Sequence, residues 1–170
     1  PWATAWDLFA RGNADGTPGA ILSRLRAAGI DAGLVDRELW CVDGTVIRAA
    51  RCAAGGGKDD DPEEPPDHAL GRSRGGFSTK IHLLCDGHGH PLDFHLTPGQ
   101  AHETTAFVPL WEGAEERVVD GDGEPIAWPV ALAGDKGFRA DWIDGYLLEQ
   151  GITPVIPSKE NEDRSARPVE

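Results

Sequence analysis

Residues 39–47 read Leu39-Trp40-Cys41-Val42-Asp43-Gly44-Thr45-Val46-Ile47, a short apolar run with a single carboxylate inside it. β-Branched residues dominate the run after its middle, which predicts a buried strand that carries Asp43. A second apolar run, residues 128–135, reads Trp128-Pro129-Val130-Ala131-Leu132-Ala133-Gly134-Asp135 and predicts a strand that ends in a carboxylate. Each of these two predicted strands therefore presents one aspartate.

The segment between the two runs predicts a β-hairpin. Residues 78–85 form one predicted strand, residues 86–90 the turn and residues 91–97 the returning strand. In the returning strand Leu92, Phe94 and Leu96 alternate with polar residues, a period of two that is typical of a half-buried strand. A small basic turn, residues 71–76, precedes the hairpin.

Helical spacing of apolar residues predicts helices on both sides of this part of the chain. Residues 2–34 predict a helical pair with a break at residues 15–19. Residues 103–116 and 141–150 predict two further helices, and residues 152–156 a last strand. The resulting order resembles that of RNase H-like folds. We therefore expect an α/β (α+β) fold with a mixed sheet, in which three antiparallel strands precede parallel strands flanked by helices.

The predicted elements divide the chain into three parts. Residues 1–36 form a short helical N-terminal segment, and residues 37–157 form the RNase H-like core. Within the core, residues 53–70 are rich in charge and Pro and poor in apolar side chains, which predicts a disordered insertion. Residues 158–170 are charged and predict a flexible tail.

The charge balance limits the classes of function. The chain has 170 residues, of which 16 are Lys or Arg and 29 are Asp or Glu, so its formal net charge is −13. This excess argues against a stand-alone basic module that coats DNA, because cations that meet phosphates dominate such binding. It does not exclude an enzyme that acts on DNA, whose metal-binding carboxylates are themselves acidic.

Two further features indicate the compartment. No stretch approaches the roughly 20 consecutive apolar residues of a transmembrane helix, so we expect no membrane insertion. The three cysteines, Cys41, Cys52 and Cys85, are an odd number without a CxxC spacing. A disulfide framework is therefore not predicted, and a reducing cytoplasm fits best.

Asp43 and Asp135 are the candidate site residues. In an RNase H-like sheet their two strands are neighbours, so the carboxylates would meet. At about 4 Å such a pair repels by about 4 kcal/mol in an effective dielectric of 20, which a shared cation relieves. Hard oxygen ligands suit Mg²⁺ or Mn²⁺, and two such ions can drive an in-line displacement at phosphorus. In the alternative interpretation each aspartate only caps a turn, Asp43 before Gly44 and Asp135 before Lys136-Gly137.

Four sequence blocks carry a resemblance to a known family. They are Val42-Asp43-Gly44-Thr45-Val46-Ile47-Arg48-Ala49, residues 71–82 (GRSRGGFSTKIH), residues 96–102 (LTPGQAH) and Gly134-Asp135-Lys136-Gly137-Phe138. In this order and spacing they resemble the DDE transposases of bacterial insertion sequences, cut-and-paste enzymes with an RNase H-like catalytic core. The blocks together span most of the chain, from about Trp2 to Pro157.

The resemblance implies a function and a set of partners. It implies metal-dependent phosphodiester hydrolysis and strand transfer at insertion-sequence ends, with Asp43 and Asp135 as the first two metal-binding carboxylates and Mg²⁺ or Mn²⁺ as the cofactor. Arg72, Arg74 and Lys80 would contact DNA phosphates. The implied partners are terminal inverted repeats, target DNA and a second copy in a homodimer, in a bacterial cytoplasm at the nucleoid.

The chain also departs from the family pattern. The family's third acid is a Glu within Tyr-x2-Arg-x3-Glu, whereas the last tyrosine here, Tyr146, is followed three positions later by Glu149. Glu160, Glu162 and Glu170 lie in the charged tail without apolar periodicity. The sequence therefore predicts a transposase cut at both ends and inactive alone.

Two other interpretations remain open. The chain could be a non-catalytic remnant that at most binds DNA or an intact copy. It could instead be a His-based metal-binding domain that uses His82, His88, His90 and His95, in which His82 and His95 could approach each other on alternating strand positions. For His82 and His102, which lie within the family blocks, a hydrogen-bonded structural role is expected.

Overall fold

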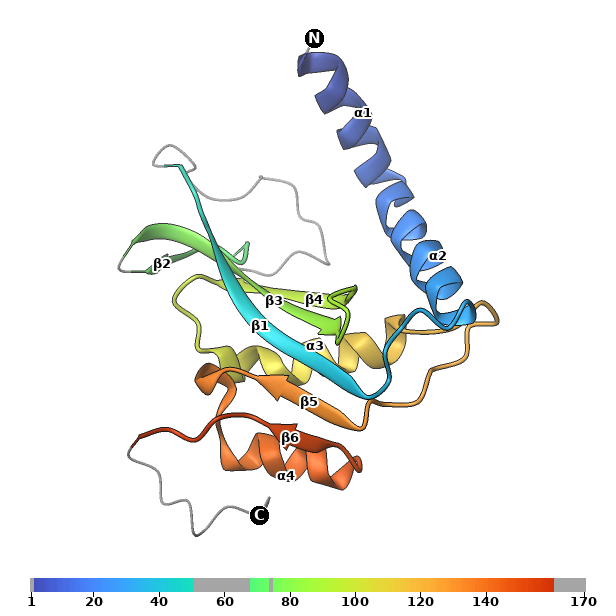
Figure 1. Ribbon diagram of the computed structural model, residues 1–170. Helices are drawn as coiled ribbons and strands as arrows, with labels where there is room; N and C mark the ends of the chain where they lie inside the picture. Colours follow the sequence, from blue (N-terminus) through green and yellow to red (C-terminus); the bar gives the residue numbers. More distant parts are fainter. Residues whose placement is uncertain (1, 51–67, 74, 161–170) are drawn as a thin grey trace.

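The computed structural model describes residues 2–50, 68–73 and 75–160 (Figure 1). Residues 53–67 of the predicted insertion lie outside the described residues. The same holds for Cys52, Arg74 and most of the predicted tail. In chain order the elements are α1 (Trp2–Ala14), α2 (Thr17–Asp31), β1 (Leu39–Arg48), β2 (Gly71–Ser73), β3 (Gly76–Asp86), β4 (Pro91–Pro98), α3 (Glu103–Arg117), β5 (Ala131–Gly134), the short 3-10 helix η1 (Lys136–Phe138), α4 (Asp141–Glu149) and β6 (Thr153–Val155).

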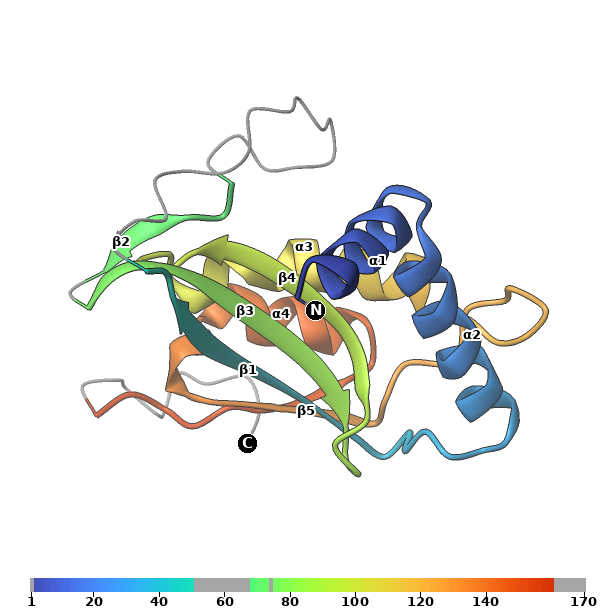
Figure 2. The same ribbon diagram turned by 90° about the horizontal axis from the view of Figure 1, so that it is seen from above.

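The strands form one mixed sheet in the order β2-β3-β1-β5-β6, and β4 also pairs with β3. β1 and β4 run antiparallel to β3, whereas β1, β5 and β6 are parallel to one another. Figure 2 shows β1, β3 and β4 side by side. The mixed sheet of the sequence-based prediction is therefore confirmed, with antiparallel strands before parallel ones, an arrangement compatible with an RNase H-like domain.

One strand was not predicted. β2 lies in the segment expected to be a basic turn, and its residues Gly71, Arg72 and Ser73 pair with Ser78, Phe77 and Gly76. β2 and β4 occupy the same edge of β3, because β2 pairs with its first residues and β4 with the rest. A three-residue strand without apolar side chains leaves no periodic pattern in the sequence.

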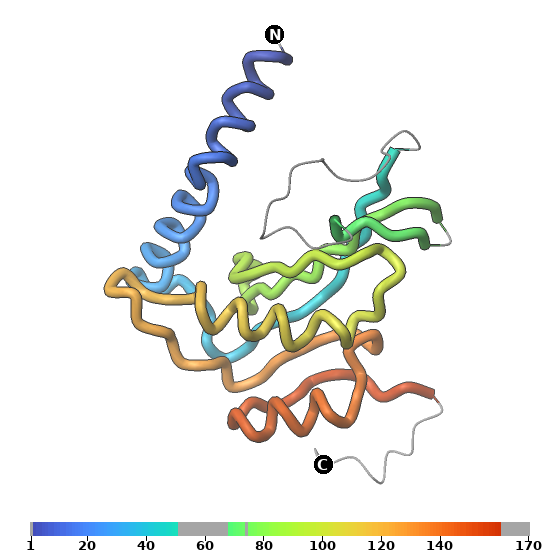
Figure 3. The backbone as a smooth tube through the Cα atoms, turned by 180° about the vertical axis from the view of Figure 1, so that it is seen from behind, coloured from blue at the N-terminus to red at the C-terminus, as the bar shows by residue number. Residues whose placement is uncertain are grey.

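Helices α3 and α4 cover one face of the sheet (Figure 3). Phe107 of α3 makes edge contacts with Trp142 and Tyr146 of α4. The core beneath them contains Trp40, Val42, Leu84, Leu92, Phe107, Leu110, Trp111, Leu132, Phe138, Ile143, Leu147, Ile152 and Ile156. The predicted core helix 141–150 is thus confirmed, with Ile143 and Leu147 fully buried and Trp142 half exposed.

The alternating strand β4 turns its polar side to the helices. Asp93 and Thr97 are buried, whereas Phe94 and Leu96 are exposed, so only Leu92 of the expected apolar face is buried. Polar partners explain this: Arg117 of α3 donates to both Asp93 oxygens at 2.9 and 2.6 Å. The register of β3 and β4 also shifts at Leu84/Cys85. The apolar side chains Phe94 and Leu96 line a groove of about 1030 Å³ beside α2.

Helices α1 and α2 form an arm that projects from the body (Figures 1 and 3). α1 contains no buried residue, and in α2 only Ile30 is buried. The base of the arm is fixed by Arg26, which donates to the Arg117 carbonyl at 2.9 Å, and by Asp31, which accepts from the Gly121 amide at 3.1 Å. No helix in the described part of the chain has the length and apolar character needed to cross a bilayer.

Candidate active site

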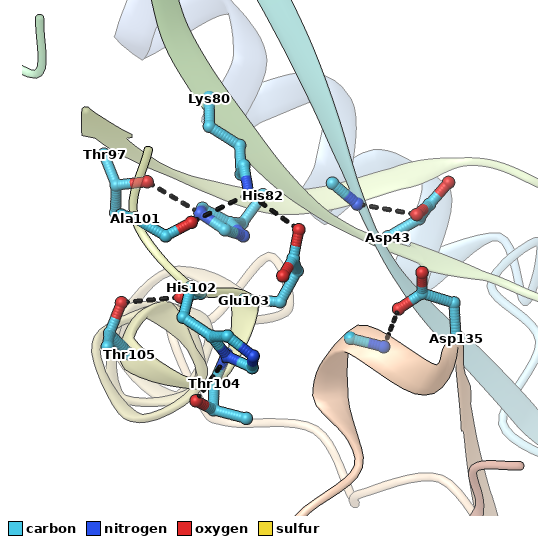
Figure 4. A network of polar contacts seen from close by, with 12 residues as sticks. Asp43, Lys80, His82, Thr97, Ala101, His102, Glu103, Thr104, Thr105 and Asp135 are labelled. Carbon is cyan, nitrogen blue, oxygen red and sulfur yellow. Dashed lines mark hydrogen bonds and ion pairs between the residues drawn. The ribbon is translucent and has the colours of Figure 1, made fainter. Parts of the chain in front are cut away.

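The two aspartates lie next to each other in the sheet. β1 and β5 are parallel, and their last aligned pair is Val42 with Gly134, so Asp43 and Asp135 follow at matching positions. Neighbouring strands are about 4.8 Å apart. Figure 4 shows the two carboxylates side by side, Asp43 on β1 and Asp135 directly after β5. The predicted neighbourhood of the two strands is thus present, and both aspartates are exposed.

Each carboxylate also accepts one local hydrogen bond, but only Asp135 caps a turn as the alternative interpretation expected, because Asp43 lies inside β1. Asp43 Oδ1 accepts a hydrogen bond from the Gly44 amide at 2.7 Å, and Asp135 Oδ1 accepts one from the Gly137 amide at 2.8 Å. Asp135 is the N-cap of η1. Within the described residues no hydrogen bond occupies Oδ2 of either aspartate. The local bonds fix both side chains and leave one oxygen of each open to a ligand.

Glu103 forms a wall of the site that the sequence did not indicate. A Cβ on Gly44 would lie 3.8 Å from Glu103 Cγ, and one on Gly137 would lie 3.0 Å from Glu103 Cδ. Glu103 therefore packs against the backbone beside both aspartates, and a side chain at position 137 would displace it. The contact becomes visible only in three dimensions, where α3 packs against β3 and η1.

Lys80 neutralises Glu103. Its ammonium group lies 2.6 Å from Glu103 Oε1 and donates to the Ala101 carbonyl at 2.8 Å (Figure 4). Burial alone would raise the pKa of Glu103, but the hydrogen bond and charge of Lys80 outweigh it and hold that pKa below its usual value. Lys80 is buried, and its ammonium group is already paired with Glu103. A DNA phosphate would therefore have to compete with Glu103 for this group.

The two predicted arginines are placed differently. Arg72 is exposed on β2, and its guanidinium lies 5.7 Å from the centre of the Phe77 ring. Arg74 lies outside the described residues. Contact of either arginine with DNA stays a prediction.

Two histidines lie next to residues of the site, His82 beside Gly44 and His102 directly before Glu103. His82 is fully buried, and its Nε2 lies 2.8 Å from Thr97 Oγ1. His82 Nδ1 faces Gly44 and has no hydrogen-bond partner within the described residues. His102 is the N-cap of α3 and accepts from the Thr104 amide at 3.3 Å. Both are hydrogen-bonded, as expected for structural roles.

Acid should destabilise the fold through His82. Burial and the nearby Lys80, partly offset by Glu103, lower the pKa of His82 from 6.5 to about 4, and His95 lowers it further. As the pH falls, the unfolded chain binds a proton at this histidine before the folded chain does. The contribution of His82 to the free energy of unfolding is therefore fully present above about pH 6.5 and is lost as the pH falls toward 4. We expect the urea midpoint to drop more over this range in the wild type than in His82→Gln. Equal drops would contradict this prediction, and exposed His102→Gln is the matched control.

The four histidines of the metal-domain interpretation do not form one cluster. His82 and His95 are paired across β3 and β4, whereas His88 and His90 lie in the turn at the far end of the hairpin. In the described part of the chain, Asp86, His88 and His90 each place one potential ligand atom within 4.8 Å of the other two. An aspartate thus completes a set that the sequence analysis left without one.

Comparison with known proteins identifies the class. The model of the family described as transposase DDE domain matches residues 35–166, well over half of the chain, and the chain belongs to this family. The matched region begins just after the helical arm and contains both aspartates.

A curated relative agrees with this assignment. The chain is 30% identical over 94 residues to a Burkholderia cepacia protein named for a transposase role in insertion sequence element IS402. The match covers 55% of this chain and 43% of that protein, so it spans less than half the length of the relative.

Proposed function

We propose that Asp43 and Asp135 hold a divalent cation, Mg²⁺ or Mn²⁺, for phosphodiester hydrolysis and strand transfer at insertion-sequence ends. The parallel register of β1 and β5 carries this proposal, because it aligns the two carboxylates at one position of the sheet. The donor set fits such an ion: two exposed carboxylates, each with an open Oδ2, are the hard oxygen ligands that Mg²⁺ and Mn²⁺ prefer.

The bound ion would supply activation of an attacking hydroxyl and stabilisation of the leaving oxygen at phosphorus. The residues of the chain do the positioning. The Gly44 and Gly137 amides hold the carboxylates in place, and the Lys80–Glu103 pair forms the adjacent wall without adding net charge. Held in this way, the aspartates need little rearrangement when a cation binds.

The partners follow from the same family membership. We propose that the complete enzyme acts on terminal inverted repeats and target DNA as a homodimer in the cytoplasm, with Arg72 and Arg74 at DNA phosphates. This chain offers two of the three acids of the family pattern, so we propose that it is catalytically inactive alone and acts, if at all, as a remnant bound to DNA or to an intact copy. Strand-transfer product from this chain alone would contradict that part of the proposal.

Calorimetric titration with Mn²⁺ tests the metal site. We expect binding by the wild type and loss of the signal in both Asp43→Asn and Asp135→Asn, because each substitution replaces an anionic ligand of one shared ion. Asp7→Asn removes an exposed carboxylate on the helical arm and should leave binding unchanged. Circular dichroism checks that all four proteins fold. A folded wild type that does not bind, or binding that depends on only one of the two aspartates, would refute the shared site.

A further inference from the structure

The turn between β3 and β4 gathers three potential metal ligands away from the two catalytic candidates. Asp86 is the last residue of β3, and His88 and His90 follow it in the turn. Asp86 Oδ2 lies 3.0 Å from His90 Nδ1 and 3.8 Å from His88 Nδ1. The three ligand atoms all lie within 4.8 Å of one another.

The carboxylate of this group is rigidly held. The Asp86 side chain is fully buried, and its Oδ1 accepts hydrogen bonds from the His88 amide at 3.0 Å and the His90 amide at 2.8 Å. Its Oδ2 accepts one from the Asp36 amide at 3.0 Å. Burial would raise the pKa of Asp86, but the hydrogen bonds from Asp36 and His90 and the nearby His90 ring lower it overall. The turn therefore fixes one anionic oxygen that faces both imidazoles.

The two imidazoles are accessible to an ion from solvent. The side chains of His88 and His90 are 65% and 57% exposed. Gly89 between them has φ 86°, a left-handed conformation that glycine adopts without strain and that lets the turn close with both rings on one side. The site thus combines a buried, fixed carboxylate with two rings that an ion can reach from solvent.

We propose that Asp86, His88 and His90 bind a divalent transition-metal ion of the Zn²⁺ type. Two imidazole nitrogens and one carboxylate oxygen are a donor set suited to Zn²⁺, with a further coordination position left to water. Ligands about 2.1 Å from a tetrahedral ion lie about 3.4 Å apart, and the separations of 3.0 and 3.8 Å bracket this value.

The ion would act as a clip at one end of the sheet. Asp86 already joins the hairpin to the segment before β1 through the Asp36 amide. A metal bound to Asp86 fixes the two turn histidines to the carboxylate that already holds the segment before β1.

Calorimetric titration of the untagged full chain with Zn²⁺ tests the site. We expect one ion per chain in the wild type and at least a tenfold weaker affinity in both His88→Gln and His90→Gln. Removing even an outer-shell partner costs about 10–100-fold in metal affinity, and a direct ligand should cost no less. Circular dichroism checks that both variants fold, so that a lost signal does not report unfolding. Zn²⁺ should also raise the midpoint of thermal unfolding of the wild type and not that of the two variants.

Two controls separate this site from the proposed catalytic one. Asp43→Asn combined with Asp135→Asn should leave Zn²⁺ affinity unchanged. His102→Gln removes an exposed histidine outside the turn and should leave it unchanged as well. Wild-type affinity retained in both turn variants would overturn the proposal, as would absence of binding up to millimolar Zn²⁺. Either result would leave the Mn²⁺ test of the catalytic pair intact, since that test relies on different residues.

Discussion

Asp144→Ala is expected to destabilise the fold by about 3–5 kcal/mol, because it removes the buried partner of the Arg139 guanidinium and leaves that charge paired with the exposed Asp141. Arg139 and Asp144 are 3% and 0% exposed, and Arg139 Nη1 lies 3.0 Å from Asp144 Oδ2. Asp144 also lies in the first turn of α4, where a negative charge is favourable. Domains are stable by only about 5–15 kcal/mol, so a loss of this size is readily measured.

The same substitution should also weaken Mn²⁺ binding, because Arg139 directly follows η1, whose N-cap is Asp135. Urea unfolding gives the stability change, and calorimetry at a temperature where the variant remains folded gives the binding change. Asp141→Ala removes the other carboxylate that contacts Arg139, at 2.7 Å, but that carboxylate is 87% exposed. It should cost at most about 1 kcal/mol. If the two variants were equally stable, the buried pair would not contribute as described.

Trp111→Ala should cost about 3–5 kcal/mol through loss of aromatic packing and the cavity left behind. Trp111 is buried and stacks on Trp128 with ring centres 4.4 Å apart. Its ring also stacks on Phe107 at 5.7 Å and contacts Trp40 at 6.4 Å. This cluster joins α3 to β1 and to the segment before β5.

Two further variants distinguish packing from the mere loss of a tryptophan. Trp111→Phe keeps most of the stacking and removes an indole N–H that lacks a hydrogen-bond partner in the described residues, so it should cost clearly less than alanine. Trp2→Ala changes a residue that is 84% exposed and should shift stability by no more than about 0.5 kcal/mol. Urea midpoints compare the three, and a Trp111→Ala cost near that of Trp2→Ala would contradict the packing role.

Much of the fold could be predicted from local pattern. The apolar run around Trp40 and the hairpin gave strands close to β1, β3 and β4, and helical spacing gave α3 and α4 within about a residue. The exposed face of β4 could not be predicted, because it depends on Arg117 reaching Asp93 from a helix 24 positions away. Local alternation shows that a strand has two faces but not which partner each face meets.

The site divides in the same way. Asp43 and Asp135 could be singled out because each lies in or directly after an apolar run, and the order of elements predicts that their strands are neighbours. Glu103 could not be found, because its contact with Gly137 arises only from the packing of α3 against that edge of the sheet. Asp86 was missed as a ligand for a similar reason: its burial and its orientation toward His88 and His90 are properties of the closed turn.

The pairing of β1 with β5 also has a consequence for the order of folding. It joins Val42 to Gly134, more than ninety positions along the chain, whereas β3 and β4 are joined through a turn of a few residues. Closing the longer loop costs more entropy, so we expect the hairpin to form early and the β1–β5 pair late. The two aspartates therefore meet late in folding, and chains in which β1 and β5 are not yet paired lack the proposed Asp43–Asp135 cation site. A cation held by both carboxylates then stabilises only the completely folded chain.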